Sequence, residues 1–356
     1  MKAVRLHAVG DIRVDDNVPE PPEPGPFEAV VAPLWGGLCG TDLKEYVGPG
    51  GGFPVKPHPI SGAGMPLIIG HELSARIVSL GSRVGEVAGG VSVGDEVAVM
   101  PLQYCGHCYQ CRRGTFVLCP RKVWTGITSH WGGLGALALV ESYQLTPLGG
   151  ISAKSAALIE PAAVALNAVM RADVRPGDVV FVAGAGAIGL FAIMSAQLSG
   201  AGYVIASESN PHRADIARSL GAEVVAPDVL EERVRELTRD QGGVDVALEC
   251  ASKPAALTTC VAVTRPGGTV GVPAVHPHSA DTDIRRVTRE QLTVVGSLGY
   301  SQDVWERTAA LIREGRIPVD RAVTATIEQD DTVTMGFAAL AEQPSKELKV
   351  LISVNA

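Results

Sequence analysis

A glycine-rich turn between an apolar strand and an apolar helix constrains the fold of this chain most. The run Val179–Val182 predicts a buried strand, and it leads into the G-x-G-x-x-G pattern of 184–189. In that setting, glycines permit a tight turn and close approach of the backbone to a pyrophosphate at the helix N-terminus. A glycine-rich turn without a ligand is the alternative. The pattern predicts a Rossmann dinucleotide site formed by Gly184, Gly186, Ala187, Ile188 and Gly189.

The rest of the chain divides into two kinds of pattern. From about residue 155, strand-like runs such as DVVFVAGA and YVIASES alternate with helical runs such as AIGLFAIMSAQLSGA. This alternation predicts βαβ units and a doubly wound parallel sheet. Before about residue 150, short β-type runs lie between turns rich in Gly and Pro, which is typical of a compact barrel. A chain of 356 residues is long enough for both domains.

An acidic residue follows the second strand of the alternating region. Glu208 lies nineteen residues beyond Gly189, where a carboxylate can accept hydrogen bonds from the adenosine ribose diol. The same carboxylate would repel a 2′-phosphate, which favours NAD over NADP. Ser207, Ser209 and Arg213 could instead host that phosphate, so both cofactors remain open.

Composition limits the classes of partner. The chain has 30 basic and 38 acidic side chains, a net charge of −8, which disfavours nucleic acid. No segment reaches the roughly 20 apolar residues that spanning a bilayer requires. Seven cysteines without a secretory signal predict reduced thiols. We therefore expect a cytoplasmic protein without nucleic acid or membrane partners.

Four cysteines lie within fifteen residues, at Cys105, Cys108, Cys111 and Cys119. Four thiolates complete a tetrahedral zinc shell and leave no position for a substrate, so the cluster predicts a structural zinc site. An empty reduced cluster is one alternative. An iron–sulfur protein is another alternative. Seven residues separate Cys111 from the final Cys119-Pro120, however, whereas bacterial ferredoxins have three residues at this point.

A second set of possible ligands is dispersed along the chain, at Cys39, His71, Glu72 and Glu160. Thiolate, imidazole and carboxylate are all good zinc ligands, and three protein ligands leave a position open for substrate. Each residue also has an ordinary interpretation. A single cysteine is often buried filler, and Glu160 before Pro161 could be a carboxylate at a helix start.

The order of these features resembles that of the zinc-dependent medium-chain dehydrogenase/reductase (alcohol dehydrogenase) superfamily along nearly all of the chain. The stretches 56–72 and 292–303 look most like its 2,3-butanediol dehydrogenase branch, near sorbitol and threonine dehydrogenases. The matching landmarks are Cys39-Gly-Thr-Asp42, Gly70-His-Glu72, the four-cysteine lobe, Glu160-Pro161 and the glycine loop.

This resemblance implies a GroES-like catalytic domain with an inserted Rossmann NAD-binding domain. We expect the catalytic domain at 1–154 and 299–356, and the insertion at 155–298. The resemblance assigns a catalytic zinc to Cys39, His71 and Glu160, with Glu72 as a ligand or beside it. It further implies hydride transfer between NAD and a secondary alcohol such as a vicinal diol or hydroxyketone, in a homodimer or homotetramer.

The proton route departs from the family pattern. Thr41 matches the position whose hydroxyl passes the substrate proton, although it could equally be a turn hydroxyl. Five residues after Cys39, where relatives often have histidine, this chain has Lys44. The proton would leave through a lysine of lowered pKa, through a substitute such as His58, or through water and the cofactor ribose. We favour water, because an exposed lysine is the ordinary case.

Two other functions remain open. One is a binding or regulatory protein that keeps the cofactor loop without catalysis, against which the complete ligand set argues. The other is a polyol, cyclitol or amino-alcohol dehydrogenase of the sorbitol or threonine dehydrogenase type.

Overall fold

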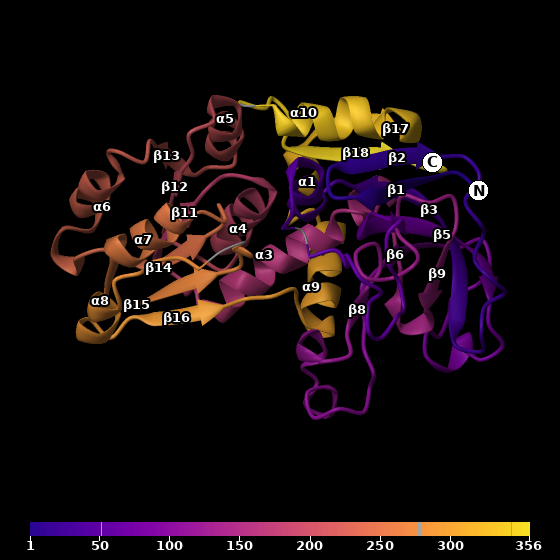
Figure 1. Cartoon of the computed structure of the whole chain (residues 1–356). Coiled ribbons are helices and arrows are strands. Elements are labelled where there is room, and N and C mark those ends of the chain that lie inside the picture. Colours follow the sequence, from indigo (N-terminus) through magenta and orange to yellow (C-terminus); the bar gives the residue numbers. More distant parts are fainter. Residues whose placement is uncertain (51, 277–278, 343) are drawn as a thin grey trace. The chain divides into compact units, whose positions relative to one another are not determined.

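The computed structural model describes residues 1–50, 52–276, 279–342 and 344–356, which form two compact units. The barrel unit consists of residues 1–160 and 323–356, and the sheet unit of residues 161–322 (Figure 1). No helix in these described ranges is long and apolar enough to cross a bilayer.

The barrel unit is built from antiparallel strands around a seven-stranded sheet of order β10-β6-β5-β3-β18-β17, with β9 on β3. Two smaller sheets, β2-β1-β4 and β7-β8, complete it. Its strands are β1 (Ala3–Ala8), β2 (Asp11–Asp15), β3 (Glu28–Gly37), β4 (Leu67–Ile68), β5 (Glu72–Leu80), β6 (Glu96–Val99), β7 (Leu102–Gln103), β8 (Val123–Trp124), β9 (Ala138–Glu141), β10 (Leu145–Pro147), β17 (Val323–Glu328) and β18 (Lys349–Ser353).

Short helices lie at the ends of these strands. The longest is α1, which is separated from β3 by Leu38 and Cys39 and has Cys39 as its N-cap. In the C-terminal part, a π-helix leads directly into α10. The helices are α1 (Gly40–Val47), α2 (Ala153–Ala156), α10 (Ala338–Ala341), the 3-10 helices η1 (Val84–Glu86), η2 (Cys111–Arg113), η3 (Phe116–Leu118), η4 (Ser142–Gln144) and η7 (Gln329–Asp331), and the π-helix η8 (Thr332–Phe337).

The C-terminal strand β18 completes the sheet beside β3. It pairs antiparallel with β3, with Leu351 opposite Gly37, and parallel with β17. The backbone N–H of Leu38 continues this pairing by donating to Val350 O at 3.0 Å. The last residues of the chain therefore hold the end of β3, immediately before Cys39.

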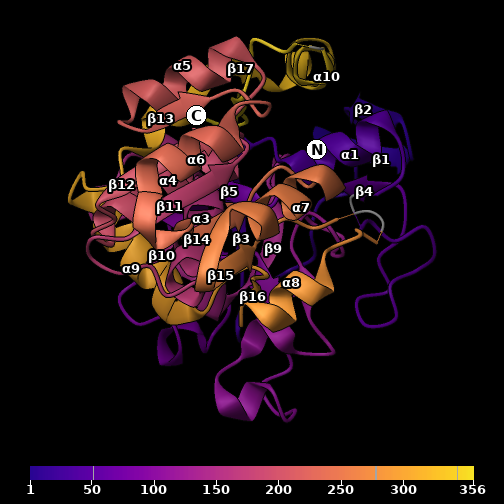
Figure 2. The ribbon, with the colours of Figure 1, turned by 90° about the vertical axis from the view of Figure 1, so that its left-hand side faces the viewer.

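The sheet unit has six parallel strands in the order β13-β12-β11-β14-β15-β16, the Rossmann arrangement. Helices pack against it, with α4 on β11 and α7 on β14 (Figure 2). The strands are β11 (Val179–Ala183), β12 (Tyr203–Ser207), β13 (Glu223–Val225), β14 (Val244–Glu249), β15 (Thr264–Val272) and β16 (Thr293–Gly296); the helices are α3 (Ile159–Arg171), which begins in the barrel unit, α4 (Ala187–Leu198), α5 (Pro211–Ser219), α6 (Leu230–Thr238), α7 (Pro254–Val263), α8 (Ile284–Arg289) and α9 (Gln302–Arg313), with 3-10 helices η5 (Arg239–Gln241) and η6 (Val319–Ala322).

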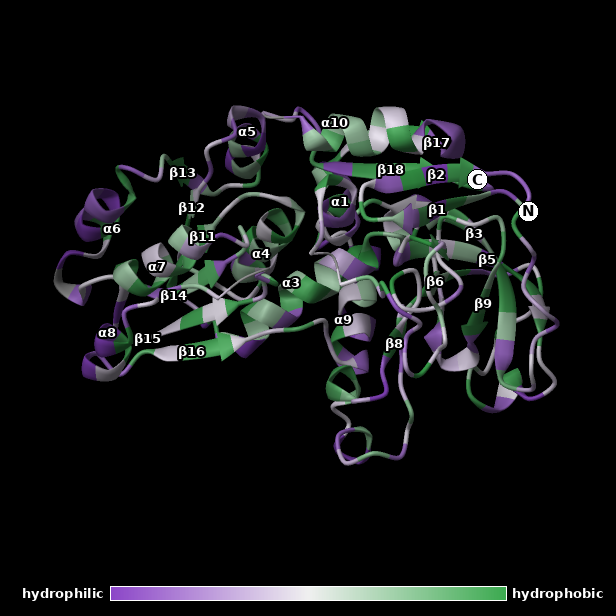
Figure 3. Cartoon of the chain, in the orientation of Figure 1, coloured by the Kyte–Doolittle hydropathy of each residue, from purple (hydrophilic) through white to green (hydrophobic). Residues whose placement is uncertain are grey.

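Burial explains the apolar runs of this unit. The central strand β11 is covered on both faces, so Val180, Phe181 and Val182 are all fully buried. Figure 3 shows hydrophilic residues concentrated on the outer helices α5, α6 and α8, whereas α3 and α4 are largely hydrophobic. The predicted α/β plus β fold, a GroES-like barrel with a Rossmann sheet, is confirmed.

The boundaries of the units differ from those that we predicted. The compact units change at 160/161 and 322/323 rather than at 154/155 and 298/299. Residues 299–322 remain with the sheet unit because η6 packs on α4 and because Asn167 of α3 donates to Gly299 O at 2.8 Å. These contacts lie far apart in sequence and leave no local signal at the boundary.

Candidate active site

Three of the dispersed candidate ligands meet in the barrel unit. Cys39 follows β3. His71 directly precedes the neighbouring strand β5, and Glu72 begins it, opposite Gly37. One ligand atom from each of Cys39, His71 and Glu72 lies within 4.8 Å of the other two. His71 and Glu72 are buried, at 5% and 0% exposure. The antiparallel register of β3 and β5 therefore assembles this cluster.

The glycine opposite Glu72 makes room for its side chain. A Cβ added to Gly37 would overlap Glu72 Oε2. Any larger residue at position 37 would displace the carboxylate. Gly37 at the end of β3 is thus part of the site, a role that the sequence did not reveal.

Asp42 supports the imidazole. Its Oδ2 accepts a hydrogen bond from the backbone N–H of Cys39 at 3.0 Å, and its Oδ1 lies 3.7 Å from His71 Nδ1. Burial lowers the pKa of His71, but the charges of Cys39 and Asp42 and the hydrogen bond to the Cys39 thiol raise it well above its usual value. His71 Nδ1 and Asp42 Oδ1 are buried and have no hydrogen-bond partner within the described part of the chain. A metal bound to the other imidazole nitrogen would fix Nδ1–H toward Asp42, so the residues present fit zinc.

Lys349 is a functional residue that the sequence did not reveal. It is 2% exposed, and its Nζ donates to both oxygens of Glu72 at 2.8 Å and to Leu38 O at 2.9 Å. Burial lowers the pKa of Lys349, but the charges of Glu72 and Cys39 raise it more, so the net direction is upward. The ammonium compensates the buried carboxylate and holds the backbone before Cys39. In the sequence, Lys349 is distinguished only as a lysine at the start of a largely apolar strand.

The other residues that the sequence suggested for catalysis lie outside this group of three. Glu160, in the first turn of α3, is 6% exposed, and its charge raises the pKa of His71. Among the described residues it falls outside the group of mutually close ligand atoms. Thr41 and Lys44 both belong to α1. His58 lies in a separate loop, where its Nδ1 accepts from the backbone N–H of Ser61 at 3.3 Å.

The four-cysteine lobe has the geometry of a closed tetrahedral site. The Sγ–Sγ distances are 4.0 Å for Cys105–Cys111, 3.9 Å for Cys108–Cys119 and 3.6 Å for Cys105–Cys119. Zn–S bonds of about 2.3 Å would give a tetrahedral edge of about 3.8 Å. All four sulfur atoms lie within 4.8 Å of one another, so the four thiols can surround one zinc ion.

Backbone N–H groups donate hydrogen bonds to sulfur atoms of this lobe. The N–H groups of His107 and Cys108 lower the pKa of Cys105 to about 6, whereas burial raises the pKa of Cys111 to about 12. The N–H of Arg121 donates to Cys119 Sγ at 3.3 Å. Hydrogen bonds of this kind stabilise a thiolate.

Aromatic rings attach the lobe to the barrel. The rings of Tyr104 and Phe116 stack with centroids 4.1 Å apart, and the Tyr104 ring also lies 4.6 Å from that of Tyr143. The backbone N–H of Tyr104 donates to the Tyr143 hydroxyl at 3.2 Å.

The glycine loop of the sheet unit has the predicted geometry. Gly184 has a φ of +91°, and its N–H donates to Ser207 O at 2.9 Å. A Cβ on Gly189 would overlap Gly184 O, so this position requires glycine. The loop connects β11 to the N-terminus of α4, where anions bind.

Glu208 is held beside this loop. Its Oε2 accepts from Ala185 N at 2.9 Å and its Oε1 from Asn210 N at 2.8 Å. Arg213, in the first turn of α5, has a buried Nε for which the described residues provide no hydrogen-bond partner. Glu208 directly follows β12, where the sequence predicts the adenosine ribose.

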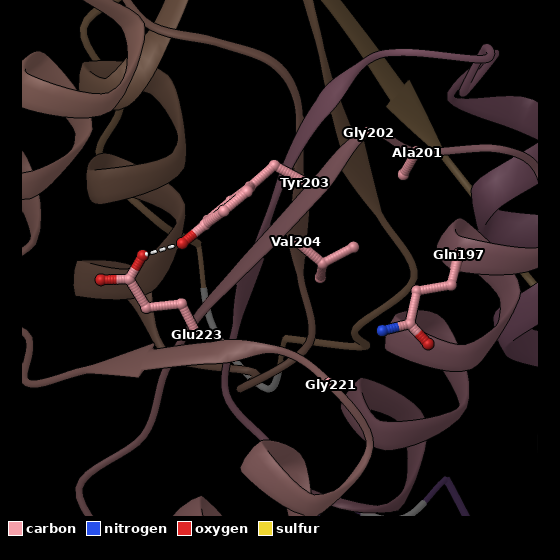
Figure 4. Close-up of a pocket in the computed structure, with 7 residues that line it drawn as sticks. All are labelled: Gln197, Ala201, Gly202, Tyr203, Val204, Gly221 and Glu223. Carbon is pink, nitrogen blue, oxygen red and sulfur yellow. Dashed lines mark hydrogen bonds between the residues drawn. The ribbon is translucent and has the colours of Figure 1, made fainter.

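A cavity of about 280 Å³ lies elsewhere in the sheet unit. Its lining comes from the end of α4, the start of β12 and the segment before β13, and Tyr203 donates to Glu223 Oε2 at 2.6 Å (Figure 4). The carboxyl ends of the strands, and hence the glycine loop, are at the opposite edge of a parallel sheet. We therefore do not associate this cavity with the dinucleotide site.

A barrel unit with a buried thiol–imidazole–carboxylate cluster and a four-thiol lobe, joined in sequence to a Rossmann sheet, defines a zinc-binding dehydrogenase. Comparison with known proteins agrees. The family model described as alcohol dehydrogenase GroES-like domain matches residues 25–150, and that described as zinc-binding dehydrogenase matches residues 187–314. The chain belongs to the zinc-dependent medium-chain dehydrogenase/reductase superfamily, an alcohol dehydrogenase that acts on CH–OH groups, as we predicted.

Its relatives are similar along their full length. (R,R)-Butanediol dehydrogenase of Bacillus subtilis is 34% identical, with 100% of both chains covered, and sorbitol dehydrogenase of the same organism is 32% identical, with 100% and 98% covered. The crystal structure of 2R,3R-butanediol dehydrogenase from B. subtilis superimposes with a TM-score of 0.89 at 33% identity and 99% coverage of both chains. A zinc-binding dehydrogenase from Sinorhizobium meliloti bound to NADP superimposes with a TM-score of 0.86 at 31% identity, covering 99% and 98%.

Proposed function

We propose that this protein is an NAD-dependent dehydrogenase that interconverts a vicinal diol or hydroxyketone, such as 2,3-butanediol or acetoin, and the corresponding ketone. The observation that carries the proposal is the buried cluster of Cys39, His71 and Glu72 in a chain whose full length matches butanediol dehydrogenases. The full-length match to sorbitol dehydrogenase favours a polyol, cyclitol or amino-alcohol substrate as the second candidate.

The barrel cluster would hold a catalytic zinc through Cys39, His71 and one carboxylate. When bound, zinc supplies a Lewis acid for the substrate oxygen, and the nicotinamide supplies a hydride acceptor. Glu72 is the favoured carboxylate ligand, because it belongs to the compact group and because a carboxylate has lone pairs for both Lys349 and a metal. Glu160, whose charge reaches His71, would alternate with it.

The chain itself would handle the substrate proton. Thr41, two residues beyond Cys39 on α1, would accept the proton from the substrate hydroxyl and pass it on. We propose that the proton leaves the Thr41 hydroxyl through water rather than through Lys44. The Lys44→Ala variant should therefore keep its turnover. Loss of turnover with unchanged zinc content and cofactor affinity would assign the proton to Lys44.

The four-cysteine lobe would bind a second, structural zinc. The Sγ–Sγ distances of 3.6–4.0 Å fit one closed tetrahedral shell, which has no position for a substrate. We therefore propose two zinc ions per chain with separate roles.

NAD is the proposed cofactor. The Glu208 carboxylate is held next to the glycine loop by Ala185 N and Asn210 N, where it would bind the ribose diol and repel a 2′-phosphate. Activity measured with NAD and NADP at equal concentration tests this assignment. We expect a clear NAD preference that Glu208→Ser reduces, and a strong NADP preference of the wild type would overturn the proposal.

A substrate panel tests the reaction itself. We expect the purified zinc-loaded enzyme to oxidise 2,3-butanediol and reduce acetoin more efficiently, by kcat/KM, than it acts on sorbitol, threonine or cyclitols. A higher kcat/KM for a polyol or an amino alcohol would replace the first candidate by the second. Absence of turnover with every compound would contradict both.

Location and assembly are further parts of the proposal. In the described part of the chain all seven cysteines are free, and four thiols must be reduced to bind zinc, which supports a location in the cytoplasm.

The side chains of Val294, in edge strand β16, and of Leu298, after it, are exposed. They support a homodimer or homotetramer formed through that edge.

A further inference from the structure

A buried carboxylate and a largely buried imidazole form a pair at the carboxyl ends of the strands of the sheet unit. Glu249, the last residue of β14, is 0% exposed. His276, four residues beyond β15, places its Nε2 2.8 Å from Glu249 Oε2. The other oxygen of Glu249 accepts from Ala251 N at 2.9 Å.

The pair links two segments that leave neighbouring strands. Because Glu249 is an acceptor, Nε2 carries the proton whether the imidazole is neutral or charged, and it donates to the carboxylate. The segment that leaves β15 is thereby held to the end of β14. His276 Nδ1 is buried and has no hydrogen-bond partner among the described residues, where Glu249 provides the polar anchor of the ring.

The turn that Glu249 fixes also adjoins the glycine loop. Cys250 N donates to Ala183 O at 3.0 Å, at the end of β11. A Cβ on Gly184 would lie 3.0 Å from Ala251 Cβ, so the turn packs directly on the first glycine. The carboxylate of Glu249 therefore shapes both the loop and the segment after β15.

The pair lies in the half of the sheet where we expect the nicotinamide. In a Rossmann fold the dinucleotide extends across the carboxyl ends of the strands, with one nucleotide on each half. Glu208, at the end of β12, marks the adenosine half. We therefore expect the nicotinamide half to bind at the carboxyl ends of β14, β15 and β16.

A buried pair of this kind is a weak source of stability. Desolvation of the carboxylate offsets most of the attraction, and apolar residues of similar volume often replace such pairs without loss of stability. Orientation of the attached segments is the role that requires these polar groups.

We propose that His276, acting through Glu249, is a positioning residue that shapes the nicotinamide half of the dinucleotide site. This inference rests on the proposed dinucleotide function. It predicts that loss of the hydrogen bond weakens binding of a nicotinamide dinucleotide and leaves binding of its adenosine half unchanged.

Calorimetric titration of His276→Ala with NADH and with ADP-ribose, which lacks the nicotinamide, tests the proposal. We expect the Kd for NADH to rise about tenfold, equivalent to about 1.4 kcal/mol, and the Kd for ADP-ribose to change less than about twofold. His276→Gln, whose amide can donate to the same carboxylate, should restore most of the NADH affinity. Val229, an exposed residue immediately before α6, gives a control, Val229→Ala, which should bind both ligands like the wild type.

Three results would overturn the proposal. An unchanged NADH affinity in His276→Ala would show that the pair does not position the nicotinamide half. An equal loss for NADH and ADP-ribose in His276→Ala and His276→Gln would show a general structural role. Failure of the wild type to bind either ligand would contradict the dinucleotide site itself, and the inference with it.

Discussion

A single buried amine connects the carboxylate of the barrel cluster to the backbone that carries its cysteine. Lys349 Nζ donates to both oxygens of Glu72 and to Leu38 O, so all three of its protons are used. The end of β3 and the start of β5 are thus held together from the C-terminal strand. A charged residue of this kind is needed because Glu72 has no exposure to water.

Removal of this amine should destabilise the fold. Lys349→Met leaves the buried Glu72 charge unpaired, and we expect a loss of about 3 kcal/mol in the free energy of unfolding. Urea denaturation of the metal-free chain measures it. Lys346→Met, at an exposed position of the same segment, is the control and should unfold like the wild type. Equal stability of Lys349→Met and wild type would mean that Glu72 is not held as a charged group.

At this scale the sequence could predict the residues of the barrel cluster but not the residues that hold them. Cys39, His71 and Glu72 belong to motifs whose order has chemical meaning. Lys349 lies 277 residues from Glu72, and its contact depends on the register of β18 on β3. Glu249 and His276 likewise carry no motif. Their pairing follows from two strand ends that meet only in the folded sheet.

Among the elements, the β3–β5 pair determines the geometry of the barrel cluster. Gly37→Ala would place a methyl group on Glu72 Oε2 and displace the carboxylate. We expect the variant to lose zinc from this site, so that metal analysis finds about one zinc per chain instead of about two. Gly85→Ala, where an added Cβ meets no atom within 4 Å, should keep both. Full zinc content in Gly37→Ala would contradict the role of this carboxylate.

The four-cysteine lobe predicts a difference in thiol reactivity. At pH 7, Cys105, with a pKa of about 6, is largely a thiolate, whereas Cys111, with a pKa of about 12, is protonated. In the metal-free chain, iodoacetamide should therefore modify Cys105 well before Cys111, and zinc should protect both. Peptide mass spectrometry after timed alkylation measures the order. Faster modification of Cys111, or no protection by zinc, would contradict the proposed site.

At the scale of the whole molecule, the local patterns predicted the type of each unit but not its boundaries. The alternating strands and helices after residue 155 indicated the parallel sheet, and the short β-type runs before it indicated the barrel. The hydrogen bond from Asn167 to Gly299 and the packing of η6 on α4 keep residues 299–322 with the sheet unit. Such contacts between distant residues have no periodic signature, so the sequence does not indicate this boundary.

We assign catalysis to the barrel cluster of Cys39, His71 and Glu72, and stability to the four-cysteine lobe. The most direct test is the NAD-linked oxidation of 2,3-butanediol by Cys39→Ser, measured together with its zinc content and melting temperature. We predict no turnover, about one retained zinc per chain and a melting temperature like that of the wild type. In Cys111→Ser, by comparison, the melting temperature should fall. Turnover of Cys39→Ser at the wild-type rate would contradict the central claim.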